Sequence, residues 1–160
     1  MTIPAHVAEF WNAFAASVGG VDNRRFYEAF CFGDGEALAN SLAELVLRRT
    51  KCATAGSVWH FEAEGKRLPA PGDLSVVTRW DGKPLCVIET LAVDVVPFSE
   101  VGADFAATEG EGDGSLSFWQ VAHREFFTRE CAEAGREFTE DMLVACERFK
   151  VVYQVSTSDV

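Results

Sequence analysis

The stretch LSVVTRWDGKPLCVIETLAVDVV, residues 74–96, decides the fold class of this chain. Two runs rich in β-branched and apolar residues, 73–80 and 84–96, lie on either side of Asp81 and Gly82. An Asp-Gly pair between two such runs is a common hairpin turn, because both residues tolerate the backbone angles of a tight turn. The sequence therefore predicts two antiparallel strands joined by this turn.

Helices and further strands are predicted on both sides of the hairpin. Runs of β-branched and aromatic residues predict two more strands, at 57–61 and 147–155. Apolar residues spaced by three and four, and capping residues before apolar runs, predict four helices. They lie near 4–18, 35–49, 99–108 and 116–134, and the second and fourth are expected to be capped by Asp34 and Ser115. This order indicates an α+β fold with a curved, mainly antiparallel sheet that can close into a small β-barrel with flanking helices.

Composition bounds the class of protein. The chain has 160 residues, of which 48% are hydrophobic, and its 13 Phe and 4 Trp suffice for the core of a single domain, 1–160. Its formal charge of −11 repels polyanions, so non-specific binding of DNA or RNA is not expected. Neither an apolar run of about 18 residues nor a basic, apolar leader is present, so we expect a cytoplasmic protein without a membrane partner.

Metal sites, cofactors and disulfides are not predicted. The chain has 5 cysteines, an odd number, and they show no CxxC spacing of a zinc site. Cys52 neighbours Lys51, a cation that can activate a thiol, but no histidine lies near it in sequence to act as its base.

The segment RRTKCATAG, residues 48–56, contains a lysine three residues before a threonine, just after a predicted helix. Both side chains can project from one turn. A threonine hydroxyl becomes a nucleophile when a base removes its proton, and burial can make a lysine such a base. Lys51 and Thr54 are therefore candidate catalytic residues, and the alternative is a solvated charge beside an ordinary turn residue.

The segment ATEGEGDGSLSFWQVAH, residues 107–123, begins with a loop of alternating acidic residues and glycines. Its spacing lacks the ligand series and the closing glutamate of an EF-hand calcium loop. His123 stands outside an HExxH pattern and has no second histidine nearby, so a transition-metal site is not predicted. The alternative to a site is a glycine-rich turn, with Ser115 as a helix cap and His123 as a core histidine bonded to a carbonyl.

Together, the two segments resemble an ASCH-domain protein. The likeness is to a longer bacterial branch of that family, in which a GxKxxT-type turn precedes an EGEGDxSLxxW segment and an HxxFF helix, and it covers roughly residues 26–153. The resemblance implies a PUA-like β-barrel with flanking helices, related to RNA-modification domains, here with an N-terminal helical extension at about 1–30. It also implies a cleft where the KxxT turn meets the acidic loop.

Small ASCH-type proteins resemble amidohydrolases that remove acyl groups from the exocyclic amine of cytidine. The resemblance assigns the catalytic roles to Lys51, Thr54 and Glu109. Other members are regarded as RNA-binding or ribonuclease-like, and a nucleotide-binding domain without catalysis would use the same cleft. Candidate substrate-binding residues are Arg49, Trp59, Glu111, Ser115, Trp119 and His123.

The chain departs from the family pattern at two places. Arg49 stands where a glycine usually precedes the lysine by two residues, and the residues after Thr54 are Ala-Gly where the small enzymes have an arginine. The ligand that the resemblance implies is a nucleoside or RNA.

Overall fold

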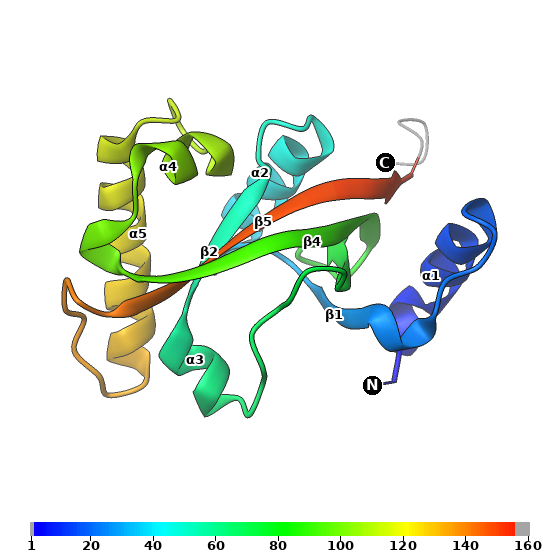
Figure 1. Cartoon of the computed structure of the whole chain (residues 1–160), viewed down its shortest axis with the longest axis horizontal. Coiled ribbons are helices and arrows are strands. Elements are labelled where there is room, and N and C mark those ends of the chain that lie inside the picture. Colours follow the sequence, from blue (N-terminus) through cyan, green and yellow to red (C-terminus); the bar gives the residue numbers. More distant parts are fainter. Residues whose placement is uncertain (1, 156–160) are drawn as a thin grey trace. The chain divides into compact units, whose positions relative to one another are not determined.

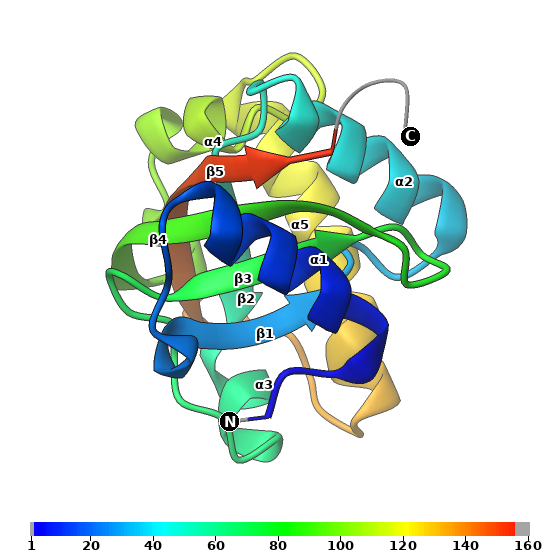
Figure 2. The same ribbon diagram turned by 90° about the vertical axis from the view of Figure 1, so that its right-hand side faces the viewer.

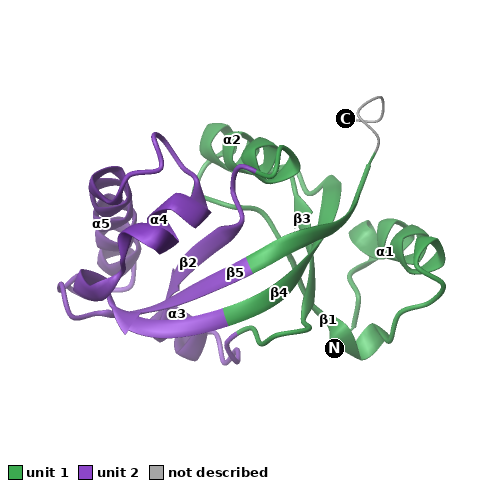
Figure 3. Ribbon diagram, turned by 45° about the horizontal axis from the view of Figure 1, so that its top comes forward, with its two compact units in different colours: residues 1–49, 69–92, 149–160 green, residues 50–68, 93–148 purple. Residues whose placement is uncertain are grey.

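A computed structural model describes residues 2–155, and the chain forms two compact units (Figure 3). Of the described residues, unit 1 contains 2–49, 69–92 and 149–155, and unit 2 contains 50–68 and 93–148. None of the described helices is both long and apolar enough to cross a membrane.

The α+β class predicted from sequence is confirmed (Figure 1). The elements are α1 (Ala5–Ser17), the 3-10 turn η1 (Asn23–Arg25), β1 (Phe26–Phe30), α2 (Glu36–Leu47), β2 (Ala53–Ser57), α3 (Val58–Ala63), β3 (Leu74–Thr78), β4 (Pro84–Pro97), the 3-10 turn η2 (Phe98–Glu100), α4 (Ala103–Glu109), α5 (Leu116–Glu133) and β5 (Leu143–Gln154).

The strands form a mixed sheet in the order β1-β3-β4-β5-β2. β3 pairs with β4 and β2 pairs with β5 in antiparallel fashion, whereas β1 runs parallel to β3. Across the described residues, β1 and β2 stand at the two ends of this order, so the predicted closure into a barrel is not confirmed. The predicted hairpin at Asp81 and Gly82 is confirmed by the β3–β4 pairing.

In unit 1, helix α1 crosses β1, β3 and β4 (Figure 2). Its buried residues follow the predicted spacing and are Val7, Trp11 and Phe14. They form one apolar cluster with side chains from the three strands, Phe26, Leu74, Val76 and Val87. Burial of such a stripe, rather than intrinsic propensity, stabilises most helices of this length.

In unit 2, β2 and β5 carry a second apolar cluster, which α4 and α5 also line. Successive side chains of a strand point to opposite faces of the sheet. Ala53 and Ala55 of β2 belong to this cluster together with Phe105 of α4 and Trp119 of α5. One face of β2 is thus directed at the two helices.

Two local predictions were wrong. Residues 57–61 were expected to form a strand, but the strand is Ala53–Ser57 and the following Val58–Ala63 is helical. Gly56 explains part of this difference, because a Cβ there would lie 3.0 Å from the Phe61 ring, which folds back onto it from α3. The expected cap of α2 by Asp34 is also absent, since Gly35 precedes the helix without a side-chain cap bond.

Candidate functional site

The two sequence segments meet through their backbones in unit 2. The Cys52 amide donates to the Thr108 carbonyl at 2.9 Å. Glu109, which was expected in a loop, is instead the last residue of α4, and Gly110 ends the helix with φ +68°. A Cβ at Gly110 would overlap the Thr50 carbonyl oxygen, so only glycine allows this close approach. The end of α4 is therefore fixed against the turn that carries Lys51.

Lys51 is buried, with 1% of its side chain exposed. Its Nζ donates to the Ala53 carbonyl at 2.7 Å, to Glu111 Oε2 at 2.9 Å and to Glu109 Oε1 at 3.2 Å. An ammonium group has three N–H donors, so every donor has an acceptor. A buried lysine charge is tolerated only with such partners. The alternative of a solvated Lys51 is thereby ruled out.

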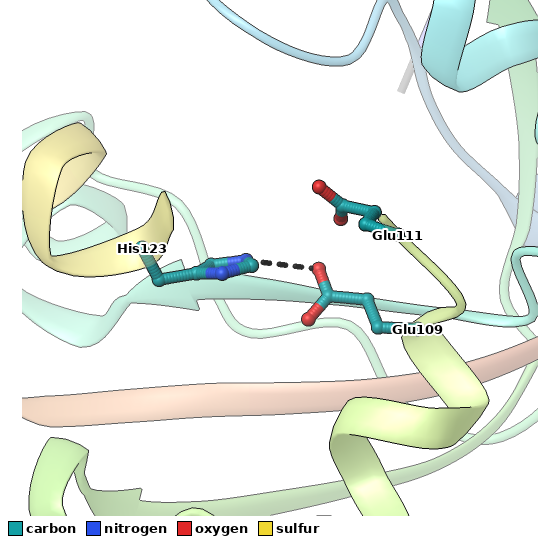
Figure 4. A group of neighbouring side chains, drawn as sticks. All are labelled: Glu109, Glu111 and His123. Atoms are coloured by element: carbon teal, nitrogen blue, oxygen red, sulfur yellow. Dashed lines mark hydrogen bonds and ion pairs between the residues drawn. The ribbon is translucent and has the colours of Figure 1, made fainter. Parts of the chain in front are cut away.

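Glu109 is equally buried, and both of its carboxylate oxygens are occupied. Oε1 accepts from Lys51 and lies 3.1 Å from His123 Nε2, and Oε2 accepts from the Trp119 indole. The contact between Glu109 and His123 is drawn in Figure 4. Burial is the largest influence and disfavours the charged form. The Lys51 cation and then His123 outweigh it and hold the pKa of Glu109 below its ordinary value. Glu109 is a fixed anion.

His123 has an acceptor at each ring nitrogen. Nδ1 lies 2.9 Å from the Trp119 carbonyl, Nε2 faces Glu109, and the ring stacks on Trp119 with centroids 4.2 Å apart. Both nitrogens can donate only in the imidazolium form. Burial, the largest influence, would lower the pKa of His123, but the Glu109 carboxylate raises it above its ordinary value. The expected carbonyl bond of this histidine is present, and an ion pair accompanies it.

Glu111 is the more accessible carboxyl, with 15% of its side chain exposed against 2% for Glu109. It extends from the loop after α4 to lie beside Glu109 (Figure 4). Burial raises the pKa of Glu111, Lys51 opposes this rise and the charge of Glu109 adds to it, so the net direction is upward. Two neighbouring carboxyls whose pKa values move apart are typical of acid–base sites.

Glu109, Glu111 and His123 also offer ligand atoms that lie within 4.8 Å of one another. Such a group resembles a divalent-metal site by residue type. Here the Lys51 ammonium bonds to both carboxylates, and the imidazolium of His123 bonds to one of them. Lys51 Nζ thus lies between the two carboxylates, and a metal ion held by them would have to displace it.

The family follows from a comparison of the whole sequence. A model of the ASCH domain matches residues 28–153, which is more than half of the chain. The chain belongs to the ASCH-domain family. No protein with a curated description matches it.

Two solved structures are similar to this ASCH-domain protein and support its assignment to the family. The crystal structure of an ASCH domain from Lactobacillus crispatus JV V101 is 42% identical, with a TM-score of 0.86, over 96% of this chain and 98% of that chain. A protein from Enterococcus faecalis V583 is 29% identical, with a TM-score of 0.87, over 96% of this chain and 92% of that chain.

Thr54 approaches the network of this ASCH domain through its backbone. It lies in β2 opposite Glu147, and the carbonyl that Lys51 binds belongs to the peptide between Ala53 and Thr54. Because Ala53 faces α4 and α5, strand alternation directs the Thr54 side chain to the other face. Within residues 2–155, no hydrogen bond joins its hydroxyl to Lys51 or Glu109.

The other candidate residues divide between the network and structural positions. Trp119 and His123 belong to the network, whereas Ser115 caps α5 by accepting from the Phe118 amide at 3.1 Å. Trp59 lies on α3 with the Arg136 guanidinium 4.6 Å above its ring.

Arg49 belongs to unit 1, where it donates to the Leu47 carbonyl and to Gln154. Its φ of +65° is a left-handed backbone conformation that glycine adopts more readily than arginine, which fits the glycine that the family resemblance implies at this position.

Sequence reasoning missed two parts of the site. The Ala53 carbonyl accepts from Lys51 Nζ at 2.7 Å, and a backbone acceptor leaves no signal in residue type. Arg148 of β5 donates to the Thr108 hydroxyl at 2.8 Å and so ties the last turn of α4 to the sheet. The strand predicted at 147–155 contains Arg148, but its sequence carried no signal of this contact.

Proposed function

We propose that this ASCH-domain protein is an amidohydrolase that removes the acyl group from the exocyclic amine of an acylated cytidine or a related nucleoside. The observation that carries the proposal is the buried Lys51 ammonium held between Glu109 and Glu111. Amide hydrolysis needs a positive group near the developing oxyanion and a proton for the leaving amine. The network offers a fixed cation and, in Glu111, a carboxyl whose pKa is raised.

In the proposed reaction, the Thr54 hydroxyl attacks the acyl carbonyl. A bond forms between the threonine oxygen and the acyl carbon, the carbon–nitrogen bond breaks, and the hydroxyl proton passes to the leaving amine. Water then hydrolyses the threonine ester, which releases the carboxylic acid and restores the hydroxyl. Thr54 starts one peptide bond from the carbonyl that Lys51 binds, but its side chain is directed to the other face of β2, so the proposed reaction requires a bound substrate whose acyl group reaches both the hydroxyl and the Lys51 ammonium.

Lys51 acts as the partner of the oxyanion in this scheme. All three of its N–H donors are engaged, and two of their acceptors are carboxylates, which favours the cation over the free amine that a general base would require. Glu111 is the acceptor that can exchange most easily, because Glu109 and the Ala53 carbonyl are fixed by the fold. When Glu111 takes up the Thr54 hydroxyl proton, which it then passes to the leaving amine, it releases Lys51, and one N–H becomes available to the acyl oxygen.

Glu109 serves as a positioning residue. Its oxygens are occupied by Lys51, His123 and Trp119, so it orients the cation rather than carrying the proton to the leaving amine. His123 and Trp119 hold Glu109 in turn. Their predicted role in substrate binding is therefore replaced in this proposal by support of the carboxylate.

The test is incubation of the protein with N4-acetylcytidine and, in parallel, with a single-stranded RNA, with the products resolved by mass. We expect cytidine and acetate, and a loss of turnover by orders of magnitude in Thr54→Val and Lys51→Met. Thr50→Val is the matched control, because Thr50 is exposed and lies four residues away. Intact acetylcytidine after long incubation with the wild-type protein would overturn the proposal.

The incubation with single-stranded RNA tests the alternative function, which is RNA binding. A protein that holds RNA by its phosphates binds more weakly as salt rises. In that case Lys51→Met would weaken binding and flatten the salt dependence, whereas Thr54→Val would have little effect. Hydrolysis of acetylcytidine together with sensitivity to Thr54→Val supports the amidohydrolase.

A further inference from the structure

Unit 1 contains a cavity of about 490 Å³ that shares no residue with the Lys51 network. Its volume lies within the range of about 300–1,000 Å³ that is usual for small-molecule sites. The polar residues of its wall come from α2, from the end of β3 and from the end of β5, and they are Asn40, Ser41, Glu44, Arg48, Arg79 and Gln154.

Each of the two amide side chains in this wall already uses its oxygen as an acceptor. Asn40 Oδ1 accepts from the Trp80 amide at 3.1 Å, and Gln154 Oε1 accepts from the Arg49 guanidinium. Since each amide oxygen faces an N–H group, the assignment of oxygen and nitrogen follows from the network. Among the described residues neither NH₂ group has an acceptor, so both can donate to a ligand in the cavity that Asn40, Gln154 and Ser41 line.

The charge of the wall is also positive. Arg48 pairs with Glu44 at 2.6 Å. The guanidinium of Arg79, which is half-buried, makes no hydrogen bond or ion pair within the part of the chain that the structure describes. Two arginines against one glutamate leave a net positive wall in a chain of charge −11. Guanidinium groups match oxyanions of phosphate and carboxylate because they present planar pairs of N–H donors.

The rest of the cavity is apolar and is formed by Leu47, Leu85 and Val155. A ligand that bonds to the polar wall and packs against the apolar wall has an oxyanion at one end and a flat or apolar body at the other. We propose that this cavity is a binding site for a small organic anion, whose phosphate or carboxylate group bonds to Arg79 and to the amide donors of Asn40 and Gln154. This site is separate from the proposed hydrolase site and does not depend on it.

The experiment is calorimetric titration of the full chain with phenyl phosphate, benzoate and benzyl alcohol at low salt. The first two probes carry an oxyanion on the same apolar ring and distinguish phosphate from carboxylate, and the alcohol lacks the charge. We expect at least one anion to bind and the alcohol not to bind. Equal binding of the alcohol, or no binding of either anion at millimolar concentration, would overturn the proposal.

Substitutions in the cavity wall test whether the anion binds at this site. Arg79→Met should weaken it about tenfold or more, because a charged hydrogen-bond donor is lost. Glu44→Gln should tighten it by removing the negative charge of the wall. Arg24→Met is the matched control, since it makes the same charge change in unit 1 on a side chain that is 91% exposed.

Gln154→Leu gives a second readout if Arg79→Met is not folded by circular dichroism, and it should also weaken binding. Wild-type affinity in both variants, or an equal loss in Arg24→Met, would show that the anion binds elsewhere or through bulk charge. Arg79→Met should leave acetylcytidine turnover unchanged, so a failure of this site and a failure of the proposed hydrolase are distinguishable.

Discussion

Replacing Glu109 with glutamine should destabilise the protein strongly, although the two side chains have the same shape. Glu109 is 1% exposed and joins Lys51, His123 and Trp119. In Glu109→Gln, two buried cations lose their shared anion, and one of the three donors meets an NH₂ group. Breaking a buried ion pair by removing one partner costs about 3–5 kcal/mol. For a chain of this length, each kcal/mol lowers the melting temperature by about 2–4 °C, so we expect a fall of about 6–20 °C.

Urea unfolding followed by circular dichroism at pH 7 measures this free energy, and a thermal scan measures the melting temperature. Glu125→Gln is the matched control, because Glu125 lies exposed on α5 and the same substitution there should change stability by less than about 0.5 kcal/mol. The reasoning is refuted if Glu109→Gln unfolds within about 0.5 kcal/mol of the wild-type protein. That result would mean that Lys51 and His123 are not held as cations by this carboxylate.

The remaining predictions concern the backbone contact, the histidine and the thiols. Gly110→Ala should destabilise more than Gly135→Ala in urea unfolding, because both glycines have φ near +70° but a Cβ overlaps backbone only at Gly110; equal effects would contradict the close approach. The pKa of His123 is raised above its ordinary 6.5 in the folded state, so protonation of His123 stabilises the fold fully below pH 6.5, and this stabilisation is lost as pH rises through the folded pKa. In urea unfolding at a series of pH values, His123→Gln should abolish this decrease of the free energy of unfolding. Burial raises the pKa of the Cys86 thiol to about 12, so iodoacetamide at pH 8 should modify half-buried Cys52 and leave Cys86 intact in the native protein, as peptide mass mapping would show.

Local sequence signals predicted the elements whose geometry is set locally. The hairpin at Asp81 and Gly82 and the cap of α5 by Ser115 are confirmed, because turn and capping residues act on neighbouring backbone. The strand β2 was not found, since its ATAGS sequence has little strand propensity and is held by pairing with β5. The parallel pairing of β1 with β3 likewise depends on partners far apart in the chain.

The site shows the same division. Lys51 was a candidate through its spacing to Thr54 and Glu109 through a family resemblance, and their 3.2 Å contact spans 58 positions that no local pattern connects. Glu111 and His123 were candidates by residue type. The sequence did not show that Glu109, rather than Glu111, is the carboxylate bonded through both oxygens, because that depends on the folded geometry. The hydroxyl of Thr54 has no bond to the network among the described residues, so its role as nucleophile stays a prediction.

The rate of N4-acetylcytidine hydrolysis in Lys51→Met, Thr54→Val and the double variant tests the central claim most directly. We predict that each single variant lowers kcat/KM by at least about a hundredfold, and that the double variant is no worse than the poorer single one, because the two residues serve one step. A Thr54→Val protein that hydrolyses acetylcytidine as fast as the wild type, or two losses that multiply in the double variant, would contradict a shared Lys51–Thr54 site.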